Sequence, residues 1–366
     1  MRIALDAMGG DYAPQSTVAG AAMALREYPK ITKLFLTGDE SAIKSELAKL
    51  GFSDPRIEIV HTTQVVEMSD AAVDSVRRKK DSSVARAVDL VKKGEADAIV
   101  SAGHTGAAVA ATTIKLRTLE GIERPGIASY LPTEKNVCVL IDAGANVDAR
   151  PVHLLQYAIM GSVLSEHVLG YSNPEIGLMS IGGEDVKGSE FTKDVFKLLK
   201  ASSLNFRGNI EGHDLFEHPV EVILCDGFTG NVVLKTAEAT AGAVFRWLKH
   251  ELTKTPFRMF GAWIARNAFR AIRRKTNYEN YGGSPLLGVN GICIIAHGSS
   301  TPLAIKNAIR VATEFIEQQV NPRIVEAVKA YNLKNAHLAQ TAAAPVTPLE
   351  TAVTLDNATM EESHAV

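Results

Sequence analysis

The 366-residue sequence has only three cysteines, and none of them forms a CxxC pair. Each one, Cys138, Cys225 and Cys293, lies in or beside an apolar run, so we expect buried, reduced thiols rather than disulfides or a catalytic nucleophile. No apolar run approaches the ~20 residues that cross a bilayer, and the chain opens without the basic and apolar regions of a secretory signal. These absences favour a cytoplasmic protein without a membrane-spanning helix.

Nucleotide-binding motifs are also absent. The Gly-Gly turn after the first apolar run, residues 8–11, matches neither GxGxxG nor a Walker A loop, so nicotinamide and ATP are not expected. No Ser-His-Asp or Cys-His unit is evident, and no residue cluster suggests a metal, so we expect no cofactor and no metal ion. The net charge of −2 gives no overall attraction to nucleic acid.

One pattern repeats along the chain: an apolar strand, a turn of small and polar residues, and a helix. The strands with such exits are expected at residues 2–7, 98–100, 137–141, 175–181, 220–224 and 292–296. This repetition predicts an α/β fold with a doubly wound, mostly parallel sheet flanked by helices, whose strand ends converge on one crevice. We expect one such domain over residues 1–338 and a disordered tail, rich in Ala, Thr and Pro, over residues 339–366.

The strand-to-helix turn at residues 225–235 is the strongest candidate for a binding site. Gly227 and Gly230 permit a tight turn, and the N–H groups of a helix start favour an anion. Asp226 ends the strand, where open α/β sheets hold ligands. Two interpretations are open for Thr229 and Asn231: one of them caps the helix, or both donate hydrogen bonds to the anion.

A similar turn at residues 101–109 contains His104, for which a structural role and an anion or acid/base role are both open. The cation run at residues 77–80 is typical of a solvated face, with attraction of an anion as the alternative. Arg124, in an extended connector, could reach a phosphate.

The segment at 245–290 is predicted to be an amphipathic helical insertion. Between Arg246 and Lys275 there are nine cations and one anion, which gives +8 and leaves −10 for the rest of the chain. On a single helix, one face would carry the apolar residues Phe257, Phe260, Ile264, Ala268 and Ile272, and the opposite face would carry the arginines. Such helices lie on anionic lipid or bind an acidic protein. A helix packed at a subunit interface is the alternative. The lipid- or carrier-binding residues proposed here are Phe257, Phe260, Trp263, Ile264, Arg266, Arg270, Arg273 and Arg274.

Several of these motifs together resemble the bacterial phosphate acyltransferase family of phospholipid synthesis, the PlsX type. They are the stretches at 6–11, 102–106, 124–125, 142–146, 208–212, 226–231, 282–288 and 297–300. The resemblance implies transfer of a long acyl chain from acyl carrier protein to inorganic phosphate. It also implies a fold like isocitrate and isopropylmalate dehydrogenases and phosphotransacetylase, a homodimer, loose membrane association, and a membrane glycerol-3-phosphate acyltransferase that consumes the acyl phosphate.

Such a reaction uses phosphate itself as the nucleophile, so the site must supply position and charge. We expect a phosphate cradle, a cation to neutralise phosphate (Lys187 or His104), and His297 as proton donor or oxyanion partner. The cradle residues are Thr105, Gly106, Asn146, Thr229, Gly230 and Asn231, with further substrate contacts from Asp6, Gly9, Gly10, Arg124, Asp226 and Ser299. Two other functions remain open: a phosphotransacetylase-like acyl-CoA:phosphate transferase, and a non-catalytic regulator that binds lipid or carrier protein.

Overall fold

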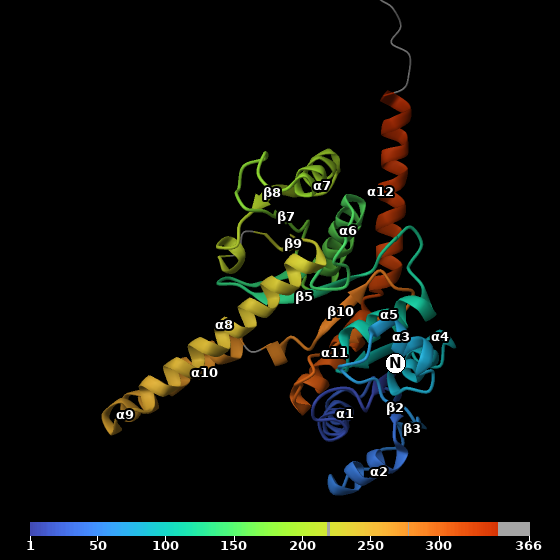
Figure 1. The fold of residues 1–366 in the computed structure, drawn as a ribbon, viewed down its shortest axis with the longest axis vertical. Coiled ribbons are helices and arrows are strands. Elements are labelled where there is room, and N and C mark those ends of the chain that lie inside the picture. The colour runs from blue at the N-terminus through green and yellow to red at the C-terminus, as the bar shows by residue number, and fades with distance from the viewer. Residues whose placement is uncertain (218–219, 277, 343–366) are drawn as a thin grey trace, which may run out of the picture. The chain divides into compact units, whose positions relative to one another are not determined.

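A computed structural model describes residues 1–217, 220–276 and 278–342 (Figure 1). Residues Met1–Lys329 form one compact unit, and Ala330–Val366 form a second. The strands of the first unit are β1 (Arg2–Asp6), β2 (Lys33–Gly38), β3 (Ile57–His61), β4 (Ala98–Ser101), β5 (Gly126–Pro132), β6 (Val137–Ile141), β7 (Ile176–Met179), β8 (Phe206–Ile210), β9 (Val222–Leu224), β10 (Ser284–Leu287) and β11 (Ile292–Ile295).

These strands form a single sheet in the order β3-β2-β1-β4-β11-β10-β5-β6-β9-β7-β8. Neighbours are parallel from β3 to β11 and again from β6 to β8. Only β10 and β5, between the two groups, make antiparallel pairs with their neighbours. The predicted α/β fold with a mostly parallel sheet is therefore confirmed.

The two parallel groups run in opposite directions, and this corrects the expectation that all strand ends converge on one crevice. Ile295, the last residue of β11, pairs with Ser284 at the start of β10. At the other end of β10, Leu287 pairs with Gly126, beside which β6 ends at Ile141. The carboxyl ends of the two groups therefore lie at opposite edges of the sheet. The expectation failed because the sequence did not reveal the antiparallel strands β5 and β10.

Helices connect many of the successive strands, as the predicted repeat of strand, turn and helix requires. Most follow a strand with a polar exit, and their apolar faces are buried: α4 and α5 pack together, as do α1 and α11. The helices are α1 (Gln15–Glu27), α2 (Glu40–Lys49), α3 (Ala72–Arg78), α4 (Ser83–Lys92), α5 (Thr105–Leu116), α6 (Pro151–His167), α7 (Glu190–Ala201), α8 (Gly227–Thr253), α9 (Pro256–Ile264), α10 (Arg266–Thr276), α11 (Pro302–Glu317) and α12 (Val320–Ala342).

The core consists of buried clusters in each parallel group. One contains Ile99, Ala108 and Leu286, and it joins α4 and α5 to the first group of strands and to β10. The other contains Leu140, Ile210 and Ile223 from the second group. Leu234 of α8 packs against both clusters, so the first turns of this helix bridge the two halves of the sheet.

The insertion is an arm of three helices, α8, α9 and α10, with α9 at the far end of α8 (Figure 1). The single amphipathic helix expected from residue 257 to residue 272 is wrong. It breaks at Ala265, the C-cap of α9, whose N–H bonds back to the carbonyls of Gly261 and Trp263. Ala268 and Ile272 therefore lie on a different helix from Phe257, and the apolar stripe is not continuous.

Helix α12 reaches Ala342, four residues into the tail that was expected to be disordered. The rest of that prediction, residues 343–366, lies outside the described residues. Across the part of the chain that the structure describes, none of the helices combines the length and apolar character needed to span a membrane.

The start of α8 leaves no room for a side chain at Gly230. A Cβ atom there would lie 1.9 Å from the carbonyl oxygen of Asp142, so the helix must contain glycine to approach this turn. Gly261 of α9 has no atom within 4 Å of the same position.

We predict that Gly230→Ala destabilises the protein by about 3 kcal/mol, since the clash is with backbone and must displace the helix. Gly261→Ala is the matched control and should be neutral or stabilise by up to about 1 kcal/mol, because alanine is the better helix former. Urea unfolding measures both. Equal stabilities of the two variants would contradict the close approach of α8 to Asp142.

Candidate active site

A groove of about 850 Å³ lies between β5 and the first turns of α8. Its walls are mostly apolar, and the first half of the sheet contributes Thr105 from α5 and His297 from the end of β11. The lining includes Ile127, Ser129, Tyr130, Leu131, Pro132, Thr133, Ala143, Leu215, Phe216, Asn231, Val232, Val233, Leu234, Ala237, Ala241, Ile295 and Ala296. Residues from both halves of the sheet therefore line this groove.

Helix α5 begins at this groove with unsatisfied donors. Its N-cap is His104, whose Nδ1 accepts the N–H of Ala107 at 3.2 Å. An accepting Nδ1 places the proton of the neutral ring on Nε2. The N–H groups of Thr105 and Gly106 precede the capped amide, so they are the orphan donors of the helix start. These donors and the helix dipole favour an anion beside Thr105.

Helix α8 begins differently, because two of its first three N–H groups already have partners. Asp226 is its N-cap and accepts both the N–H and the hydroxyl of Thr229, at 2.9 and 2.6 Å. The N–H of Gly227 donates to the carbonyl of Asn146. Neither Thr229 nor Asn231 is the cap, and of the first three N–H groups of this helix only that of Phe228 has no partner within the described residues. Asn231, one turn further on, is exposed and lines the groove.

The turn after β6 is organised by the buried carboxylate of Asp142. Oδ1 accepts the N–H groups of Ile127, Gly144 and Ala145 at 2.8–3.0 Å, and Oδ2 accepts that of Asn146 at 2.7 Å. Burial raises the pKa of this carboxyl, and the four backbone donors oppose that effect by stabilising its charged form. Because these four partners are all donors, the geometry fits the ionised carboxylate.

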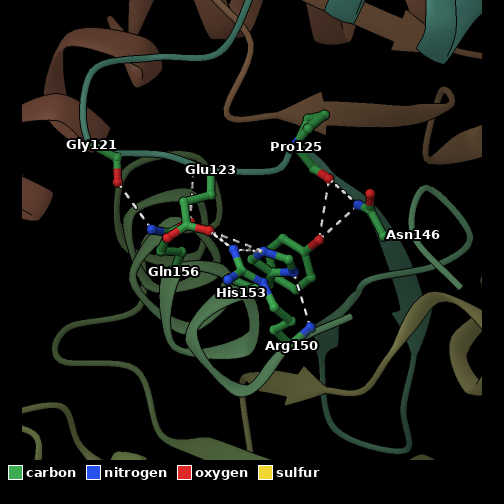
Figure 2. Close-up of polar contacts among 8 residues, drawn as sticks. Gly121, Glu123, Pro125, Asn146, Arg150, His153 and Gln156 are labelled. Atoms are coloured by element: carbon green, nitrogen blue, oxygen red, sulfur yellow. Dashed lines mark hydrogen bonds and ion pairs between the residues drawn. The ribbon is translucent and has the colours of Figure 1, made fainter. Parts of the chain in front are cut away.

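The side chain of Asn146 ties this turn to the connector before β5 and to α6 (Figure 2). Its amide nitrogen donates to the carbonyl of Pro125 and to the hydroxyl of Tyr157, the latter at 2.7 Å. The Tyr157 hydroxyl in turn donates to Pro125 at 3.3 Å. Burial raises the pKa of Tyr157, which keeps the hydroxyl protonated. The side-chain amide of Asn146, which was predicted to bind phosphate, therefore donates hydrogen bonds to protein groups instead.

Helix α6 also fixes the connector that carries Arg124 (Figure 2). The side-chain amide of Gln156 donates to the carbonyl of Gly121 and accepts the N–H of Glu123. The carboxylate of Glu123 in turn contacts Arg150 and His153. Burial lowers the pKa of His153, although Glu123 opposes this effect. His153 Nδ1 accepts the N–H of Arg150, which also fits a neutral ring. Arg124 itself is exposed and does not line the groove.

The Gly-Gly turn after β1 packs against the start of α5. Asp6 is buried and accepts the hydroxyl of Ser101 at 2.7 Å, and burial raises the pKa of this carboxyl. A Cβ on Gly9 would lie 2.7 Å from both the Asp6 carboxylate and the amide nitrogen of Gly103. Asp11 donates its N–H to the carbonyl of Gly298, so this turn also contacts the loop after β11. Asp6, Gly9 and Gly10 thus support the α5 start from outside the groove.

Of the other predicted residues, His297 lines the groove and Lys187 does not. His297 Nδ1 accepts the N–H of Ser299 at 3.2 Å and lies 2.8 Å from its hydroxyl. With Nδ1 accepting, the neutral ring carries its proton on Nε2. Lys187 is exposed in the loop after β7.

The cysteines are buried and free, as predicted. Burial raises the pKa of Cys138 to about 12 and that of Cys293 to about 11, and it raises the pKa of Cys225 as well. Thiols of this kind are poor nucleophiles. Within the described ranges, no group of three His, Cys, Asp or Glu side chains could hold a metal ion.

The structure therefore brings Thr105, Asn231 and His297 to one groove and places the other candidates around it. Sequence reasoning missed Tyr157, which lies inside an apolar helix without any polar signal. It also missed β5 as a wall, because residues 124–128 were interpreted as a connector. The apolar run from Ile127 to Leu131 was the signal that could have identified this strand.

The fold is that of an α/β protein, and it resembles the fold of solved phosphotransacetylases. A phosphotransacetylase from Streptococcus pyogenes aligns with a TM-score of 0.56 and 18% identity, covering 87% of this chain and 94% of that chain. EutD phosphotransacetylase from Staphylococcus aureus aligns with a TM-score of 0.53 and 15% identity, covering 90% and 94%. At these identities the likeness concerns the fold.

Sequence relatives give the family. The family model described as "Fatty acid synthesis protein" matches residues 1–323. A phosphate acyltransferase of Akkermansia muciniphila is 55% identical over 332 residues, which cover 89% of this chain and 95% of the relative. One of Pelotomaculum thermopropionicum is 47% identical over 336 residues, covering 92% and 97%. The chain belongs to this phosphate acyltransferase family, as its motifs predicted, and it is an enzyme of the acyltransferase class.

We predict that Tyr157→Phe lowers the free energy of unfolding by about 1 kcal/mol, the usual net value of a hydrogen bond. It should also raise the KM for phosphate, because the Asp142 turn and the α8 start become less well held. Tyr12→Phe, at a side chain that is 56% exposed, is the control and should change neither quantity. Thermal unfolding and steady-state kinetics test this, and wild-type values for Tyr157→Phe would refute the role of the hydroxyl.

Proposed function

We propose that this protein transfers a long-chain acyl group from acyl carrier protein to inorganic phosphate, giving acyl phosphate for phospholipid synthesis. The observation that carries the proposal is the groove, which combines apolar walls with a helix start suited to an anion. Family membership supports the same reaction, since the curated relatives are named phosphate acyltransferases.

The apolar walls suit the acyl chain. Residues 127–133, along β5, line the groove over about 20 Å at ~3.3 Å per residue, which is comparable with an extended long-chain acyl group. Leu131, Leu215 and Phe216 lie along one part of this path, and Val233 and Leu234 of α8 line it from the other side. Burial of these apolar groups against the chain would provide the binding energy.

Phosphate would bind where the groove meets α5. The N–H groups of Thr105 and Gly106, the Asn231 amide and the protonated Nε2 of His297 would donate to its oxygens. A phosphate oxygen then attacks the thioester carbon, and the carbon–sulfur bond breaks. The carrier leaves as a thiolate, which takes up the proton that the phosphate loses on acylation. Lys187 would supply charge after movement of its loop, which contains Gly182, Gly183 and Gly188. His104 is proposed as the cap that orients these donors rather than as a cation.

Direct attack needs no covalent enzyme intermediate. The three thiols are buried with raised pKa values, so none of them is suited to accept the acyl group. The acceleration would come from fixed donors that stabilise the oxyanion and from the alignment of phosphate with the thioester.

An acyl-CoA:phosphate transferase is the second candidate, because the structural neighbours are phosphotransacetylases. A short acyl group would leave most of the apolar groove empty, so the groove favours a long-chain donor. A non-catalytic carrier- or lipid-binding regulator is the third. Release of thiol from palmitoyl carrier protein that requires phosphate supports the proposed enzyme. Release from acetyl-CoA alone supports the second candidate, and no release supports the third.

We predict that Asn231→Ala and Lys187→Ala each raise the KM for phosphate or lower kcat. Loss of a hydrogen bond to a charged group is worth about 1.5–3 kcal/mol, or roughly 10- to 100-fold. Lys197→Ala, an exposed lysine of α7, is the control and should behave as wild type. Unchanged kinetics in both Asn231→Ala and Lys187→Ala would exclude this arrangement of the phosphate site.

The helical arm is proposed to rest on anionic lipid, where a membrane glycerol-3-phosphate acyltransferase consumes the lipophilic product. Helix α9 has no buried residue, and Phe257, Phe260 and Trp263 are 86, 59 and 59% exposed. Phe260 and Trp263 stack, and Arg266 lies over the Trp263 ring at 4.7 Å. Aromatic groups beside arginines suit the bilayer interface.

We also propose a homodimer, with Val244 and Trp247 of α8, 50 and 67% exposed, at its interface.

We predict that Arg266→Glu, Arg270→Glu and Arg274→Glu together weaken binding to anionic vesicles by at least about 100-fold, since each cation contributes ~1 kcal/mol. Vesicles of phosphatidylglycerol and phosphatidylcholine are compared by co-sedimentation at low salt. Reversal of Lys193, Lys197 and Lys200 on α7 is the matched control. Retention of wild-type binding by the arm variant would exclude the arm as the lipid-binding element.

A further inference from the structure

The surface around α3 combines exposed apolar side chains with cations that form no ion pair within the described part of the chain. Val65, Met68 and Val73 are 39, 67 and 47% exposed. Three exposed cations follow them, and we call these six residues the α3 face: Val65, Met68, Val73, Arg77, Arg78 and Lys80. Exposed apolar groups next to cations that no acid neutralises are typical of a protein-binding surface rather than of a solvated helix.

The charges of the α3 face are available to a partner. The run at residues 77–80 contains one more cation, Lys79. Its Nζ donates hydrogen bonds to the carboxylate of Asp70 and to the carbonyl of Val65. Glu67 and Asp74 are exposed acids of the same segment, yet within the described residues neither pairs with Arg77, Arg78 or Lys80. Lys44 and Lys49 of α2, by contrast, each pair with a glutamate of their own helix.

The α3 face lies beside the phosphate end of the groove. Helix α3 packs against α5, and a Cβ on Gly106 would lie 3.0 Å from the Cβ of Ala72. Thr105, the neighbour of Gly106, lines the groove. Arg77 and Arg78 follow Ala72 by five and six residues, or about 8–9 Å along the helix. A macromolecule bound to the α3 face could therefore place a tethered thioester at the mouth of the groove.

We propose that the α3 face is the docking site of the acidic carrier protein that delivers the acyl group. The proposal rests on the proposed function, because it names the surface that the acyl donor uses. Arg77, Arg78 and Lys80 would face carboxylates of the carrier, and Met68 and Val73 would cover its apolar side chains. Charge at such a rim accelerates association and orients the partner. The arm then serves the membrane, and the two basic surfaces have separate partners.

The test is reversal of the three cations, Arg77→Glu, Arg78→Glu and Lys80→Glu together, in the full-length enzyme. With palmitoyl carrier protein as donor, kcat/KM should fall at least ten-fold at low salt, while the KM for phosphate stays unchanged. With palmitoyl-pantetheine, which has the thioester but no carrier, kcat/KM should equal that of wild type. The wild-type rate with the carrier donor should fall as salt rises, and that of the variant should not.

The control reverses Lys44, Lys49 and Lys92, which are exposed on α2 and at the last turn of α4. It should keep wild-type rates with both donors. The docking site would be overturned if kcat/KM of the reversal variant of Arg77, Arg78 and Lys80 fell equally with the carrier and pantetheine donors. It would also be overturned if this variant lost vesicle binding but kept wild-type activity with the carrier donor. Arg77→Ala, Arg78→Ala and Lys80→Ala together, without introduced repulsion, should show a smaller loss in the same direction. If the wild-type enzyme itself transfers no acyl group from the carrier, the proposed function fails instead.

Discussion

The carboxylate of Asp142 is the contact on which the site depends. It accepts four backbone N–H groups from both sides of the β5–β6 pair, so the turn at residues 143–146 has one conformation. The carbonyl of Asn146 then receives the first amide of α8, and the carbonyl of Asp142 sets how closely Gly230 approaches. A helix held in this way presents Asn231 to the groove. One buried charge thus places a polar group of the second half of the sheet opposite Thr105 of the first.

The opposed directions of the two parallel groups give the groove its form. Ligands of an ordinary parallel sheet collect at one edge, where the strands end. Here β10 and β5 separate the groups, and the ends of the strands lie at opposite edges. The cavity instead follows β5 across a face of the sheet, with α8 as its other wall. The cavity is therefore lined along β5 and not confined to a single strand-to-helix turn.

The hydrogen bonds seen in the structure changed the roles assigned to several predicted site residues. His104, Asp226, Thr229 and Asn146 are polar residues at helix starts, and each was a reasonable ligand on that ground. In the structure their polar groups bond one another or nearby backbone. Residues of the same type serve as caps, as turn supports or as ligands, and only the neighbouring atoms decide among these roles. Thr105, Asn231 and His297 are the candidates that remain at the groove.

The sequence by itself determined the α/β class, the positions of strands such as residues 137–141, the buried cysteines and the family, because local apolar periodicity and motif spacing are properties of the chain alone. The tertiary structure decided the strand directions, the break at Ala265, the course of the groove and the network of Tyr157, Asn146 and Pro125. Tyr157 and Pro125 are 32 residues apart and meet only after α6 packs beside β5. Contacts of that separation leave no local pattern, so the sequence could not reveal which of its polar residues remained available to a substrate.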